Sequence, residues 1–152
     1  MRRSTIPEAA GPCVIAASAL AACAAPSAPD AQRVGLTASS YNAGAIGHAQ
    51  LIGRDQQTDV VLTVSGVSSW IARPVHLYAY VHEGSCEQPS TQPQYALTDR
   101  VLTRRGTDGF LTLTTTLPVS LAALRGSPHA LLVRSSPADA NLPLFCGDLQ
   151  PA

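Results

Sequence analysis

The stretch VHLYAYVH, residues 75–82, decides the fold class, because apolar side chains alternate along it with polar and aromatic ones. Successive side chains of a β-strand point to opposite faces, so a period of two predicts a strand with one buried face. The apolar face carries Val75, Leu77, Ala79 and Val81, and the opposite face carries His76, Tyr78, Tyr80 and His82. We therefore expect this segment to be a half-buried strand.

Similar short segments lie on both sides of it, each ended by turn residues. We expect strands over 34–37, 44–52, 60–64, 96–102, 110–117, 130–134 and 144–149. Asp108 and Gly109 suit a tight hairpin, and only 120–125 is typical of a helix, with Ser120 as its N-cap. Many short strands between Gly and Pro turns predict an all-β fold, a β-sandwich with Greek-key connections.

The composition of the whole chain restricts the class of protein. Of its 152 residues, 45% are hydrophobic and 13% are charged, which is typical of one globular domain and argues against disorder throughout. Ten arginines balance ten acidic residues, and a net charge of zero argues against a nucleic-acid partner. No apolar run reaches the roughly 18 residues that a membrane-spanning helix needs.

The N-terminus has the pattern of a secretory signal. Arg2 and Arg3 precede an uncharged run over 11–22, which is too short for a membrane span. The alternative, a core helix, is disfavoured by the prolines in and before this run. The run leads into LAAC, residues 20–23, which resembles the lipobox of bacterial lipoproteins, whose cysteine is lipidated and becomes the first mature residue.

This resemblance implies a division of the chain into three parts. Residues 1–22 are the expected signal peptide, and 23–32 are the lipidated Cys23 followed by a flexible tether of Pro, Ala and Ser. Residues 33–152 are the expected β-sandwich domain. The membrane would then be one partner, through the lipid anchor, and the alanine after Cys23 implies the outer membrane.

The four cysteines can be sorted by their positions. Cys13 lies in the expected signal peptide and Cys23 is the expected lipid site, which leaves Cys86 and Cys146. An exported protein meets an oxidising compartment, so we expect these two to form one disulfide. The alternative is a pair of free buried thiols.

Three short motifs resemble the copper/zinc superoxide dismutase fold family. They are VSGV at 64–67, VHEGSC at 81–86 and FCGDL at 145–149. The resemblance covers about residues 45–150. It implies that family's β-sandwich and supports a disulfide between Cys86 and Cys146.

The metal ligands of that family are mostly missing. Tyr80 and His82 stand where the family has its His-x-His pair of copper ligands, and Arg134 matches the late copper histidine. The segment 87–110, where the zinc loop would lie, contains no histidine, and Pro143 matches the family's channel arginine. One remaining ligand cannot hold a redox copper, so we expect no metal, no cofactor and no dismutase activity.

The polar stripe of His76, Tyr78, Tyr80 and His82 has two interpretations. It is a candidate face for a ligand, but a solvated sheet face explains it equally simply, and we favour the latter. His76 and His82 lie about 20 Å apart along a strand, so they cannot share one metal ion. His129 lies at the turn formed by residues 126–128 and is expected to be exposed there.

Two other features are candidates for binding. Trp70 is a possible ligand platform, but we expect its loop to close one end of the sandwich as a plug. Arg100, Arg104 and Arg105 form a basic cluster, which we interpret as a solvated hairpin end rather than an anion site.

The residues contain no motif of nucleophilic catalysis, phosphate binding or metal-dependent proteolysis. We therefore expect a lipid-anchored protein of the bacterial cell envelope that acts as a non-catalytic binding or interaction module. Its partner would be an unknown envelope protein or a small ligand. The alternative is a metal-handling protein that binds copper or zinc through His82, and an active dismutase ranks third.

Overall fold

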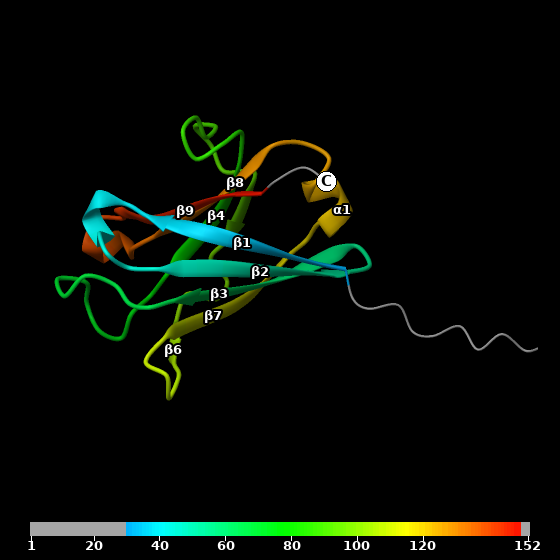
Figure 1. Ribbon diagram of the computed structural model, residues 1–152. Coiled ribbons are helices and arrows are strands. Elements are labelled where there is room, and N and C mark those ends of the chain that lie inside the picture. The colour runs from blue at the N-terminus through cyan, green and yellow to red at the C-terminus, as the bar shows by residue number, and fades with distance from the viewer. Residues whose placement is uncertain (1–29, 150–152) are drawn as a thin grey trace, which may run out of the picture.

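An antiparallel sheet of nine strands forms the body of the protein (Figure 1). The computed structural model describes residues 30–149. Its strands are β1 (Ala31–Ala38), β2 (Gly47–Arg54), β3 (Gln57–Val64), β4 (Tyr78–Glu83), β5 (Tyr95–Leu97), β6 (Arg104–Arg105), β7 (Leu111–Leu117), β8 (His129–Arg134) and β9 (Pro143–Leu149). Its short helices are η1 (Ser40–Asn42), α1 (Leu121–Leu124) and η2 (Pro137–Asp139). The predicted all-β class is confirmed.

The sheet curls because one strand belongs to both of its halves. The strand order is β5-β4-β8-β9-β1-β2-β3-β7-β6. Residues 31–36 of β1 pair with β2, whereas Thr37 and Ala38 pair with β9. We call β1, β2, β3, β7 and β6 the first half-sheet, and β9, β8, β4 and β5 the second. The finer superoxide dismutase-like and Greek-key assignment stays a prediction.

A glycine makes room for the bend of β1. A Cβ atom on Gly147 of β9 would lie 2.6 Å from the carbonyl oxygen of Gly35 and 2.8 Å from side-chain atoms of Val34 and Leu36. Real Cβ atoms do not approach this closely, so only glycine allows β1 to cross β9 here.

The core lies between the two half-sheets and follows the predicted alternation. Val75, Leu77, Ala79 and Val81 are all buried, as expected from the stretch 75–82. The first half-sheet supplies the facing side chains, among them Val60, Leu62, Val64, Leu111, Leu113 and Leu117. Threonines between these leucines in β7 face outward, apart from the buried Thr115.

The pairing of the stretch 75–82 differs from a single continuous strand. β4 begins at Tyr78, because the residues before it lie beside 101–103 instead of β8. The Leu77 amide donates to the Val101 carbonyl at 2.8 Å, and the Thr103 amide donates to Val75 at 3.1 Å. The strand expected over 96–102 is accordingly reduced to the short β5 and a bridge at Leu102.

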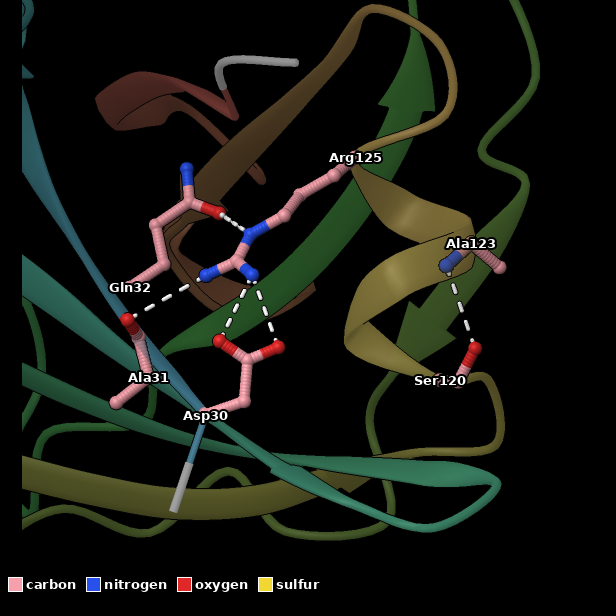
Figure 2. Close-up of polar contacts among 6 residues, drawn as sticks. All are labelled: Asp30, Ala31, Gln32, Ser120, Ala123 and Arg125. Atoms are coloured by element: carbon pink, nitrogen blue, oxygen red, sulfur yellow. Dashed lines mark hydrogen bonds and ion pairs between the residues drawn. The ribbon is translucent and has the colours of Figure 1, made fainter. Parts of the chain in front are cut away.

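The disulfide between Cys86 and Cys146 is confirmed, with the two Cα atoms 5.8 Å apart. The predicted helix is also present as α1, and the hydroxyl of Ser120 caps it by accepting the Ala123 amide hydrogen at 3.3 Å (Figure 2). The disulfide ties the loop after β4 to β9, and the helix lies beside the start of β1.

Arg125, at the end of α1, holds the start of β1 (Figure 2). Its Nη1 atom lies 2.8 and 2.9 Å from the two carboxylate oxygens of Asp30, and its Nε donates to Gln32 at 3.1 Å. The folded structure therefore includes Asp30 and Gln32, the end of the segment expected to be a tether. Cys13 and Cys23 lie outside the described residues. Within residues 30–149, no helix has the length and apolar character to cross a membrane.

Candidate functional site

The structure brings together three of the four residues of the predicted ligand face. Tyr78, Tyr80 and His82 lie on the outer side of β4, where they pair with residues 134, 132 and 130 of β8. His76 precedes β4 and forms a bridge with Leu102 instead. The stripe is therefore divided between two places in the fold.

This face is not a solvated sheet surface at its His82 end. The loop that follows β4 folds back over it and is tied to β9 by the disulfide. The carbonyl oxygen of Ser90 lies 2.8 Å from Nδ1 of His82, and the Cys86 amide donates to the Asp148 carboxylate. Only 7% of His82 is exposed, so the expectation of a solvated residue is wrong here.

Beside the loop, a hollow of about 300 Å³ lies over the outer face of the paired strands β4 and β8. It is lined by Tyr80, His82, Thr91, Pro93, Arg134 and Asn141. The rings of Tyr80 and His82 meet edge to face with centroids 6.5 Å apart. Because a carbonyl oxygen only accepts hydrogen bonds, Nδ1 of His82 carries the hydrogen, and Nε2 of the neutral ring is an acceptor.

Arg134 determines what this hollow can bind. Its guanidinium donates to the backbone oxygen of Asn141 at 2.9 Å and keeps its positive charge. A positive charge repels a metal cation and attracts an anionic or polar ligand. His82 is the one imidazole in this lining, whereas a redox copper needs several, so the residues present do not fit the copper site of the family that the sequence resembles.

His82 and His129 stand at neighbouring positions of the paired strands β4 and β8, where Ala130 is opposite His82 and Glu83 is opposite His129. His48 lies on the outer face of the first half-sheet, where burial, and secondarily the charge of Arg33, lowers its pKa. Across residues 30–149, no group of three His, Cys, Asp or Glu residues could hold a metal ion.

His129 was expected to be exposed in a turn, and this is wrong. Only 4% of His129 is exposed. It is the first residue of β8, and the turn over 124–128 directs its ring toward the interior. Its Nδ1 lies 3.0 Å from the Leu124 carbonyl oxygen and 2.8 Å from that of Ser127. Its Nε2 lies 2.7 Å from Oε1 of Gln94. His129 thus fastens three segments and is not available to a ligand.

A second surface lies at one end of the sheet, and sequence reasoning considered only Trp70 of its three residues. Tyr41, Ile46 and Trp70 are 49%, 63% and 48% exposed, and we call them the apical patch. Leu102 is the remaining exposed large apolar residue of the described chain. The expected plug is Ile71, which is 2% exposed, and not its neighbour Trp70.

The loops that carry the apical patch are locked together. The Ser68 amide donates to Oδ1 of the buried Asn42 at 2.9 Å, and its hydroxyl donates to the Tyr41 carbonyl at 2.6 Å. Ile46 exchanges hydrogen bonds with Ser65, at 2.8 and 3.0 Å. The patch is thus displayed on a fixed backbone.

The apical patch and the start of the folded chain lie at opposite ends of β1. Asp30 precedes this eight-residue strand and η1 follows it, so the two are about 25 Å apart. Figure 1 shows η1 at one end of the sheet and α1 at the other. Tyr41 stands among Gly, Ser and Asn residues without periodicity, and Ile46 was expected inside a strand over 44–52 but precedes β2, so neither exposure was predicted from the sequence.

Comparison of the chain with family models, with curated proteins and with solved structures finds no match. The interpretation of both surfaces consequently depends on their own geometry.

Proposed function

We propose that this protein is a lipid-anchored module of the bacterial cell envelope that binds an envelope protein through the apical patch and has no catalytic role. One observation carries the proposal. Of the four exposed large apolar residues in the described chain, three are on interlocked loops at the end of the fold far from Asp30.

Physical chemistry supports an interaction role for this patch. Tyrosine and tryptophan are enriched at the centres of protein interfaces, where they bury much area with few rotatable bonds. The hydrogen bonds of Ser68 and Ser65 fix the backbone before any partner arrives. Little conformational entropy is then lost on binding, which favours affinity.

The anchor is the other half of the proposal. Lipidation of Cys23 would attach the chain to a membrane, since each buried methylene contributes about 0.8 kcal/mol and stable attachment needs more than one chain. The first expected outcome is that Cys23→Ala releases the protein from the membrane fraction of fractionated cells. Unchanged sedimentation of this variant with membranes would contradict the lipoprotein assignment.

The interaction itself can be tested by chemical cross-linking of the full chain in intact envelopes. We expect Trp70→Ser to reduce the yield of a specific cross-linked partner at least about tenfold, the usual effect of truncating a central aromatic residue. Leu102→Ser is the matched control, because Leu102 is 56% exposed but lies outside the patch. Equal yields from both variants, each with an unchanged thermal unfolding midpoint, would refute the role of the patch.

One observation favours the second candidate, a metal-handling protein. The hydrogen bond to Ser90 leaves Nε2 of His82 as a possible ligand in the hollow. Titration of the full chain with Cu²⁺ and Zn²⁺, with a superoxide assay alongside, separates the candidates. Our proposal expects no stoichiometric binding that depends on His82, and tight binding that is lost in His82→Gln would favour metal handling instead.

A further inference from the structure

A second hollow, of about 440 Å³, lies at the edge of the first half-sheet. It is lined by residues of β6, of β7 and of the segment before β6, among them Arg100, Arg104, Arg105, Thr112 and Thr114. Ten arginines in the chain, less Arg2 and Arg3, leave eight in the described residues, and three of these eight border this one hollow.

The shortness of β6 creates the hollow. β6 pairs with β7 only at Arg104–Thr112 and Arg105–Leu111, so β7 has no strand partner beyond Thr112 on this side within the described chain. Arg104 shares a face of the sheet with Thr112, and Arg105 leaves the strand on the opposite face. The arginines thus border the open edge of β7 from both of its faces.

These three guanidinium groups have no carboxylate partner in the described part of the chain. The ion pairs found there are Arg54–Asp59 and Arg125–Asp30. The two acids nearest in sequence have other contacts, since Asp99 accepts from the Thr115 hydroxyl at 2.9 Å and Asp108 from the Phe110 amide at 3.0 Å. Neither acid lines the hollow.

Most of the donors of these arginines also remain available. Arg105 uses Nη1 to donate to the Gly109 carbonyl at 2.8 Å, which holds its side chain against the hairpin. The side chains of Arg100 and Arg104 make no hydrogen bond within residues 30–149 and are exposed, while the backbone of Arg104 pairs with β7. Arg104, Thr112 and Thr114 share one face of the sheet beside the hollow, so the N–H groups of Arg104 and two threonine hydroxyls can reach the same ligand.

Guanidinium forks and hydroxyl groups match the oxygens of a phosphate group. The three positive charges repel one another, and a bound anion relieves this repulsion. Asp108, whose carboxylate lies beside the lining residue Gly106, offsets part of this charge without an ion pair to the arginines. The volume is within the range of ligand pockets, about 300–1,000 Å³, so it has room for a phosphate together with the group that carries it. We propose that this hollow binds the phosphate group of a small molecule or of a lipid headgroup. The proposal is independent of the function assigned to the apical patch.

The test is calorimetric titration of the full chain in nonionic detergent with inorganic phosphate and with glycerol phosphate. We expect Arg104→Gln to weaken binding about tenfold, as the loss of a charge-assisted hydrogen bond does, and Arg100→Gln to act in the same direction. Arg54→Gln is the matched control, because it removes the same charge from an exposed arginine elsewhere. It should change the affinity less than about twofold, since distant exposed charges are screened by salt.

A second arm identifies the source of the phosphate. Vesicles of phosphatidylglycerol or of phosphatidylcholine are sedimented with the Cys23→Ala chain, which has no lipid of its own to insert. Binding to phosphatidylglycerol that is lost in Arg104→Gln indicates a lipid headgroup, and binding of the soluble phosphates alone indicates a small molecule. The proposal is overturned if neither soluble phosphate binds, or if Arg54→Gln and Arg104→Gln weaken binding equally.

Discussion

The disulfide gives the sharpest prediction about stability, because it joins residues far apart in the chain. Cys86 and Cys146 are separated by 60 positions. In the chain-entropy model, closing a loop of this size restricts the unfolded chain and stabilises the fold by about 4 kcal/mol. Replacement of both cysteines by alanine should remove this amount from the free energy of unfolding.

Urea denaturation of the oxidised full chain measures the effect. With a denaturant slope of about 1.5 kcal/mol per molar, a loss of 4 kcal/mol lowers the midpoint by roughly 2–3 M. Since single domains are stable by about 5–15 kcal/mol, such a change is a large part of the total. Wild type in reducing agent is the control, and its midpoint should match that of the double variant.

The competing explanation is that the disulfide only fastens a local loop. Several contacts hold this loop without it, including the Ser90 amide bonded to the Glu83 carbonyl at 2.8 Å and the Gln94 amide bonded to Val81 at 2.8 Å. If the bridge acts locally, the midpoint falls by less than about 0.5 M. That result would refute the argument from chain entropy.

Three further substitutions, with Gly35→Ala as a control, test the packing and the electrostatics. Gly147→Ala should destabilise by about 1–3 kcal/mol because its Cβ would clash with β1, whereas Gly35→Ala, with open space around its Cβ, should change the urea midpoint little. His129→Ala should cost about 2 kcal/mol in the same assay, since it removes the contacts to Ser127 and Gln94. The lowered pKa of folded His48 means that the unfolded chain binds its proton more readily. Its contribution to stability is therefore present above the unfolded pKa of about 6.5 and is lost as the pH falls below it. His48→Gln should flatten the slope of unfolding free energy against pH between 5 and 7, and an unchanged slope would contradict this.

The face assignments of the strands could be predicted from the sequence. In a half-buried strand, a shift of the register by one residue would turn every apolar side chain toward solvent. The alternation in 75–82 is therefore compatible with only one assignment of its residues to the two faces. The partners of that stretch could not be predicted. Residues 75–77 pair with 101–103, and Tyr78 onward pairs with β8, because the chain path after β5 brings 101–103 alongside. The pattern of residues 75–82 does not indicate where the chain runs after β5.

The candidate sites were predicted less well, for a related reason. Trp70 and Ile71 are neighbours in an irregular loop, and only the fold determines which of them turns inward. His82 has a regular place on β4, but its burial comes from the loop that the disulfide brings back over it. Periodicity predicts which way a side chain points within an element. It does not predict which distant segment covers that side chain.

The position of the apical patch restricts what could bind there if Cys23 is anchored. Residues 23–30 can extend at most roughly 25 Å between the membrane and Asp30, which Arg125 fixes to α1. The patch lies about 25 Å further along β1, so it could stand no more than roughly 50 Å from the membrane surface. A partner confined to the lipid layer could meet the patch only if the domain tilted onto its side or turned over toward the membrane. The partner of an upright domain must instead project from its membrane or lie free beside it.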